Sequence, residues 1–136
     1  MGEIERFIER DHFAKHLGIE VIEASEGRAR ARMEVGEHLL NSAGTLHGGA
    51  LFSLADAAFS AASNSHGTLA MAISASISYF RAVTSGTLSA SAEEISLNPR
   101  LATYLIRIED DAGMVIAHFQ GTVYRKKDRI ADLPGQ

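Results

Sequence analysis

The sequence contains no cysteine and only two prolines among its 136 residues. Without cysteine the chain has no disulfide, no thiolate nucleophile and no zinc site built on sulfur. It also lacks an excess of positive charge, because 13 Lys and Arg are set against 17 Asp and Glu, a net charge of −4. There is therefore no bulk positive field to hold nucleic acid or an anionic membrane.

Long apolar runs are missing as well. No run reaches the roughly 18 residues that a membrane span requires, and residues 1–6 alternate in charge without the pattern of a signal peptide. Composition is otherwise that of a globular protein, with 46% apolar and 22% charged residues. We expect a cytoplasmic protein with a single domain over residues 1–136, a core at about 13–125 and a charged, frayed tail at 126–136.

Apolar periodicity and glycine positions divide the chain into two helices and six strands. The first helix is short and amphipathic and ends at Gly18. Residues 28–35 begin with alternating arginines and alanines, which predicts a half-buried strand whose arginines face solvent. This order, with short turns between the last strands, predicts an α+β fold in which an antiparallel sheet curls around a long central helix. The helices are expected at 3–16 and 47–65, and the strands at 19–24, 28–35, 69–80, 87–97, 101–110 and 114–125.

The central helix contains one informative charge. Its segment 48–65, GGALFSLADAAFSAASNS, is small or apolar nearly all around and carries a single charged residue, Asp56. A helix of this kind is typically buried, and a buried carboxylate is costly unless it is paired or hydrogen-bonded. Asp56 is therefore either a hydrogen-bonded structural carboxylate or a general base or nucleophile facing a cleft.

The start of this helix also allows two interpretations. His47 is followed by Gly48 and Gly49, and first-turn N–H groups have no intrahelical partner and lie at the positive end of the helix dipole. Glycines leave these N–H groups uncovered, so that a substrate carbonyl could approach and its oxyanion be stabilised. The alternative is that the glycines only permit a tight turn into the helix, with His47 in a structural role.

The spacing of these residues constrains any shared chemistry. His47 and Asp56 are nine positions apart, which places them on opposite sides of a helix and about 13 Å apart along its axis. One chain cannot bring both to the same bond. If both are catalytic, the site must be shared between two subunits, and two-fold symmetry would create two such sites.

These residues resemble a known family over about 13–125 of the chain. The motif consists of Asn41-x5-His47-Gly48-Gly49-x6-Asp56 and Tyr79-Phe80-Arg81. It is similar to the motif of hotdog-fold acyl-CoA thioesterases, in particular the PaaI-like branch named for phenylacetate degradation. The resemblance implies a hotdog fold, in which a curved sheet wraps a long helix. It also implies a homodimer at least, and commonly a homotetramer, with active sites at the dimer interface.

The resemblance also implies roles for individual residues. Asp56 corresponds to the carboxylate that attacks the thioester or activates water, and Gly48 to the backbone N–H that polarises the thioester carbonyl. His47 and Asn41 match positions that shape this end of the site or place water. Some relatives add a serine or threonine from the strand after the helix, for which Ser74 is the candidate here.

Coenzyme A carries phosphates and requires basic contacts. The basic candidates are Arg81, Arg100 and the run Arg125-Lys126-Lys127, and the resemblance adds Asn98, which lies in a turn where such relatives often place CoA contacts. Otherwise Arg81 and Arg100 are surface charges and the run is a solvated tail. The family requires no metal and no cofactor. The only histidines at a metal-ligand spacing, His12 and His16, have no third ligand close in sequence.

The sequence thus predicts an enzyme that hydrolyses an aryl- or medium-chain acyl-CoA to CoA and a carboxylic acid. One alternative is a hotdog dehydratase or hydratase, which pairs a histidine with an acidic residue and carries proline-rich loops. The absence of proline before Pro99 counts against it. The other alternative is a protein that binds acyl-CoA without cleaving it, which would have little reason to keep Asp56 in an uncharged helix.

Overall fold

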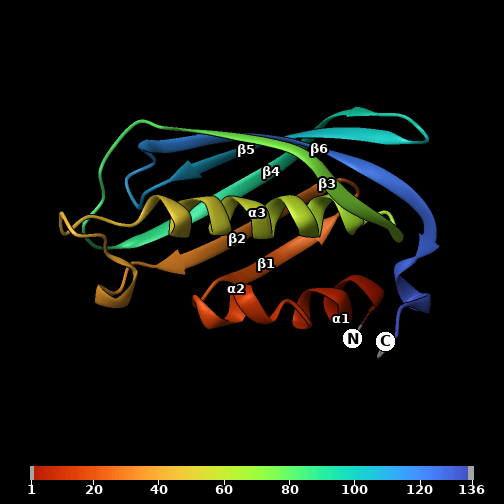
Figure 1. The fold of residues 1–136 in the computed structure, drawn as a ribbon, viewed down its shortest axis with the longest axis horizontal. Helices are drawn as coiled ribbons and strands as arrows, with labels where there is room; N and C mark the ends of the chain where they lie inside the picture. Colours follow the sequence, from red (N-terminus) through yellow and green to blue (C-terminus); the bar gives the residue numbers. More distant parts are fainter. Residues whose placement is uncertain (1, 135–136) are drawn as a thin grey trace.

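The computed structural model describes residues 2–134, in which a six-stranded antiparallel sheet curves over one long helix (Figure 1). The predicted α+β architecture and the order of the long helix and six strands are confirmed. The helices are α1 (Glu3–Glu9), α2 (His12–His16) and α3 (Gly48–Asn64), with short 3-10 turns η1 (Glu37–Leu39) and η2 (Ile130–Asp132). The strands are β1 (Glu20–Ser25), β2 (Arg28–Glu34), β3 (Thr68–Tyr79), β4 (Thr87–Leu97), β5 (Leu101–Glu109) and β6 (Val115–Arg129).

The strand order in the sheet is β1-β2-β4-β5-β6-β3. Although β3 precedes β4 in the chain, it lies at the far edge of the sheet and pairs only with β6. Residues 71–76 and 78–80 are exposed, so that this edge strand presents both of its faces as well as its unpaired backbone to solvent. The sequence did not predict the position of β3 beside β6, because the length of a turn does not specify which strands become neighbours in the sheet.

Small side chains allow α3 to lie close to the sheet. The helix packs mainly against β2 and β4. Ala55, Ala58 and Ala62 of α3, like Ala31 of β2 and Ala90 of β4, have no exposed surface. Alanine at such positions brings backbones close together at the density of a protein interior. In β2 the burial alternates strictly, so the prediction that its arginines face solvent is confirmed.

Three aromatic rings fill the space where α3 crosses the end of the sheet. Phe59 of α3 packs edge-on against Tyr104 at 5.8 Å between ring centroids, and tilted against Phe119 at 5.5 Å. Gly121 of β6 lies directly beneath the Phe59 ring. An added Cβ at Gly121 would lie 2.6 Å from the Phe59 Cζ atom, so glycine is the residue that leaves room for the ring.

The ends of the chain differ from the sequence prediction. The expected helix 3–16 is divided, because Asp11 leaves the helical conformation and caps α2 by accepting a hydrogen bond from the Ala14 N–H at 3.0 Å. The expected frayed tail is wrong for residues 126–130, since β6 continues to Arg129 and Ile130 is buried. Arg129 reaches Glu3 at 3.6 Å, which joins the two ends of the chain. Residues 135–136 of the expected tail lie outside the described residues.

None of the helices within residues 2–134 combines the length and apolar character that crossing a bilayer would require.

The contact between Gly121 and Phe59 gives a testable prediction about packing. We expect Gly121→Ala to lower the free energy of unfolding by about 1–3 kcal/mol, because the new methyl group overpacks a ring held by Tyr104 and Phe119. Chemical denaturation measures this. The control is Gly36→Ala, whose Cβ would meet only the exposed His38 side chain and should leave stability nearly unchanged. Equal stability of the two variants would contradict the prediction.

Candidate active site

The first turn of α3 presents a backbone N–H without an acceptor. His47 is the N-cap, and its Nδ1 accepts a hydrogen bond from the Gly49 N–H at 2.8 Å. The N–H groups of Ala50 and Leu51 donate to the His47 carbonyl. Within residues 2–134 the Gly48 N–H has no such partner. It is therefore free to donate to a ligand at the positive end of the helix dipole.

Two further details define this end of the helix. Because Nδ1 of His47 accepts a hydrogen bond, its neutral ring carries the proton on Nε2, which faces solvent as a donor. Tyr79, at the end of β3, donates from its hydroxyl to the Gly48 carbonyl at 3.1 Å. Tyr79 belongs to the sequence motif, but nothing in its spacing shows that β3 ends beside the start of α3, so this contact could not be predicted.

Asn41 shapes the loop before the helix. Its side-chain oxygen accepts hydrogen bonds from the Ala43 and Thr45 N–H groups at 2.9 and 3.1 Å, and its amide nitrogen donates to the Thr45 hydroxyl at 2.9 Å. The Asn41 N–H also bonds the Thr45 carbonyl. Asn41 therefore positions the turn that leads to His47, as an Asx turn does.

Asp56 lies on the side of α3 that the sheet leaves open. The expectation that it is enclosed is wrong for the single chain, where Asp56 is exposed at the centre of the stripe formed by Gly49, Ser53, Asp56 and Ser60. Surrounding atoms nevertheless screen the carboxyl from water. This partial burial raises the pKa of Asp56 above its ordinary value, and the nearby Asp11 carboxylate raises it further.

One chain does not bring Asp56 and the Gly48 N–H to the same atom. The two residues lie eight positions apart on a continuous helix, a separation of about 12 Å along the axis. The helix predicted from the sequence is therefore formed. Because it keeps Asp56 and the Gly48 N–H apart, a site that uses both groups needs a second subunit.

Ser74 lies on the other face of the sheet. In β3 it pairs with Thr122, whose hydroxyl bonds Thr103 at 2.8 Å. Residues that pair directly share a face, and Thr103 lies between the buried, helix-facing Ala102 and Tyr104. Ser74 therefore points away from α3 and does not join Asp56 within the chain.

Three of the CoA candidates gather at one end of the sheet. Asn98 forms the β4–β5 turn, accepting hydrogen bonds from the Arg100 and Leu101 N–H groups. Arg125 donates to the Asn98 carbonyl at 3.0 Å, and Arg100 to the Tyr124 hydroxyl at 3.3 Å. Another candidate, Arg81, follows the opposite end of β3 and is separate from this group.

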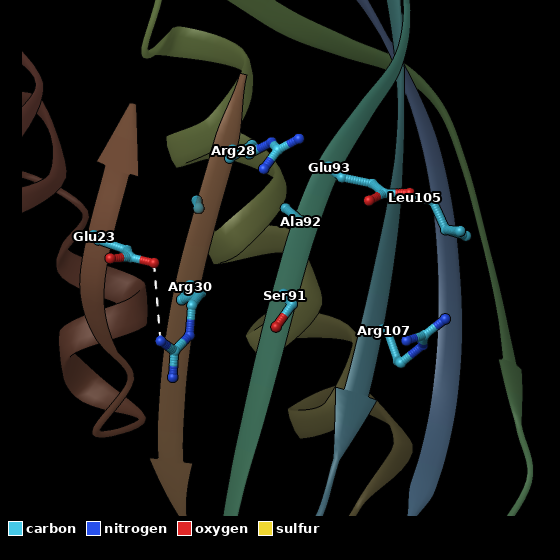
Figure 2. A pocket seen from close by; sticks show the side chains of 9 residues that line it. Glu23, Arg28, Arg30, Ser91, Ala92, Glu93, Leu105 and Arg107 are labelled. Atoms are coloured by element: carbon cyan, nitrogen blue, oxygen red, sulfur yellow. Dashed lines mark ion pairs between the residues drawn. The ribbon is translucent and has the colours of Figure 1, made fainter. Parts of the chain in front are cut away.

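A hollow of about 270 Å³ lies on the outer face of the sheet, away from α3 (Figure 2). Arg30 and Arg107 stand on either side of Ser91, and Arg30 approaches Glu23 at 3.9 Å. Because α3 and the outward arginines are on opposite faces of the sheet, this hollow is not part of the site around Asp56.

A cluster of titratable groups lies at the C-terminal end of α3. Glu94 lies 2.7 Å from Nε2 of His66 and accepts a hydrogen bond from the Tyr104 hydroxyl at 2.5 Å. Burial raises the pKa of Tyr104, and so does its hydrogen bond to Glu94. This cluster ties the helix end to the sheet. Within residues 2–134 no group of three or more His, Asp or Glu side chains has the geometry of a metal site.

Comparison with known proteins agrees with the sequence motif. The family described as "Thioesterase superfamily" matches residues 43–117. A protein of Archaeoglobus fulgidus is 46% identical over 85% of this chain and 75% of its own length. The protein named acyl-coenzyme A thioesterase PaaI of Escherichia coli is 39% identical over 86% of this chain and 84% of its own length.

Solved structures show the same fold. The structure of the E. coli PaaI protein, from the phenylacetic acid degradation operon, aligns with a TM-score of 0.90 and 35% identity, covering 93% of each chain. The expected hotdog fold is thereby confirmed.

The raised pKa of Asp56 predicts how stability depends on pH. The ionised carboxylate destabilises the fold above its ordinary pKa of 3.8, and fully so above its raised folded-state pKa. We therefore expect Asp56→Asn to raise the melting temperature at pH 7, by an amount that solvent screening keeps small, with the gain disappearing as the pH falls towards 3.8. Asp128→Asn, on an exposed part of β6, removes the same charge and serves as control. A lower melting temperature for Asp56→Asn at pH 7 would contradict this account.

Proposed function

This chain belongs to the thioesterase superfamily, as a PaaI-like thioester hydrolase with the hotdog fold, and we propose that it hydrolyses aryl- or medium-chain acyl-CoA. The observation that carries the proposal is the free Gly48 N–H at the start of α3, together with a carboxylate of raised pKa in the same helix. One group suits a developing oxyanion and the other suits proton abstraction.

In the proposed reaction, the thioester oxygen accepts a hydrogen bond from the Gly48 N–H. Asp56 takes a proton from a water molecule, whose oxygen forms a bond to the carbonyl carbon. The C–S bond then breaks, and the proton passes from Asp56 to the departing thiolate of CoA. The products are CoA and a carboxylic acid. A raised pKa supports the role of general base, because it increases the proton affinity of Asp56 at neutral pH.

We propose that each site combines Asp56 of one subunit with Gly48 of the partner subunit. The separation of the two residues along one helix argues against a site made by a single chain and supports a shared one. The exposed edge strand β3 supplies a surface for pairing, since an unpaired strand edge readily accepts a second strand. His47 and Asn41 hold the first turn of α3 and its loop in place.

The register of this pairing follows from the packing of α3 on β3. Tyr79 bonds Gly48, and Ala70 bonds Asn64 at the other end of the helix, so that α3 and β3 run in opposite directions. Asp56 is therefore level with about residue 75 of β3. We therefore propose that Gly48 of the partner subunit lies level with Asp56, with Tyr79 of the partner subunit facing about residue 75 and the two-fold axis near Ile77.

Pairing of β3 also brings the CoA candidates together. With the two-fold axis near Ile77, Arg81 of the partner subunit lies level with Ile73, three residues from Ala70, which pairs with Arg125 of the group formed by Asn98, Arg100 and Arg125. Their positive charges match the phosphates of CoA. Association of two dimers into the expected homotetramer stays a prediction.

Single variants test the two reacting groups. We expect Asp56→Asn to reduce kcat to nearly zero while the fold is retained, because the amide cannot accept the proton. Gly48→Val should cost on the order of 3 kcal/mol of transition-state stabilisation by displacing the N–H donor, since a Cβ there already lies 3.2 Å from the Tyr79 hydroxyl. Release of thiol from acyl-CoA measures both. Tyr79→Phe controls for the loss of the contact to Gly48. Wild-type turnover by Asp56→Asn would overturn the assignment.

Mixing the two inactive variants tests the shared site. A dimer of one Asp56→Asn and one Gly48→Val subunit has one site with both lesions and one with neither. Random exchange of equal amounts should therefore restore about a quarter of wild-type activity. Mass spectrometry verifies that exchange has occurred. If mixed dimers form and no activity returns, both residues act within one chain.

A further inference from the structure

A hollow of about 390 Å³ runs beside the first turns of α3. Phe13 and Leu17 of the α2 segment form one wall, and Leu39, Leu40 and Ala50 complete its apolar lining. Its volume is within the range of small-molecule sites. Because His47 and Gly49 also line it, the hollow begins next to the Gly48 N–H, to which the proposed function assigns the thioester oxygen.

The polar groups beside the apolar wall are largely occupied. The Ser53 hydroxyl donates to the Gly49 carbonyl at 2.8 Å, and the Gly49 N–H donates to Nδ1 of His47 at 2.8 Å. His38 and His47 also line the hollow, but no lysine or arginine does, and Asp56 lies one turn beyond Ser53 on the same stripe. Because the lining is mostly apolar and carries no permanent positive charge, the hollow suits an uncharged apolar group better than one that ends in a carboxylate.

Among residues 2–134, Phe13 is the most exposed large apolar side chain, with 64% of its surface accessible. Its helix is held in place by other contacts, because Ala14 is buried and Asp11 caps α2. The ring is thus fixed at the mouth of the hollow without belonging to the core. Occupation of the hollow by an apolar group would cover it and gain hydrophobic free energy.

A second hollow, of about 310 Å³, lies further along α3 between the N-terminal helices and Ser60. Its rim carries four ionisable side chains, Glu9, Asp11, Lys15 and Glu20. Burying these groups against an apolar ligand would cost free energy. The first hollow is therefore the better acceptor for an apolar chain.

We propose that the hollow lined by Phe13 binds the acyl group of the substrate, on the subunit that supplies the Gly48 N–H, and that Phe13 determines specificity. The inference rests on the proposed function. It selects uncharged apolar acyl groups of about six carbons or more, including aryl groups, over acetyl groups and over chains with a terminal carboxylate.

The test compares kcat/KM for acetyl-, hexanoyl- and adipoyl-CoA. Wild type should prefer hexanoyl-CoA over both others. In Phe13→Ala the ratio of hexanoyl to acetyl should fall about tenfold, and Met114→Ala, another truncation of an exposed apolar side chain, should leave that ratio unchanged. Because Phe13 is mostly exposed, its truncation leaves no core cavity.

A matched pair of substitutions separates the two hollows. Ser53 and Ser60 lie on the same stripe of α3 and are both half-buried. Ser53→Leu fills the proposed acyl site and should lower the ratio, whereas Ser60→Leu should not. Two results would overturn the inference. One is a hexanoyl-to-acetyl ratio that responds to Ser60→Leu but not to Phe13→Ala or Ser53→Leu. The other is equal use of adipoyl- and hexanoyl-CoA. Failure of wild type to cleave any of the three esters would instead contradict the proposed function.

Discussion

The close seating of α3 against the sheet is the constraint on which the rest of the molecule depends. Alanines at the contact, among them Ala31, Ala58 and Ala90, let the helix approach β2 and β4 without intervening bulk. The helix is thereby fixed in position along its whole length, from the His47 cap to the contact of Asn64 with Ala70. A rigid helix can hold one group at its start and another at its middle at a constant separation, which a loop could not do.

Several features that weaken the isolated chain are the ones that the proposed chemistry uses. Asp56 is held where its carboxylate is partly desolvated and close to Asp11. The Gly48 N–H has no acceptor among the described residues, and β3 leaves an unpaired edge. Functional sites commonly store such local costs. A second subunit would pair the edge of β3, and a bound thioester would accept the hydrogen bond of the Gly48 N–H.

The sequence predicted the elements well because their periodicities are strong. The alternation in β2 and the uncharged, proline-free helix α3 are local patterns, and local physics is sufficient for them. The start of α3 also agrees with the helix expected at 47–65, because the alanine- and leucine-rich, proline-free run begins there.

What could not be predicted depends on contacts between distant segments. The position of β3 at the sheet edge, the hydrogen bond of Tyr79 to Gly48 and the outward direction of Ser74 all follow from pairing with β6. Asp56 was expected to be enclosed because one-dimensional composition cannot show which side of a helix the sheet leaves open. The charged side chains after residue 125 led to the prediction of a frayed tail, although β6 continues to Arg129.

The strand pairing proposed for β3 has a consequence for how finely the site can be tuned. Two antiparallel strands can change register only in whole steps, and moving the two-fold axis by one residue slides one copy past the other by about 7 Å. A displacement of a reacting group by only about 1 Å can already lower the rate about 100-fold. Only one register therefore aligns the two halves of the site, and every other register separates them by several ångströms. Substitutions in β3 would either preserve catalysis or abolish it, with little between.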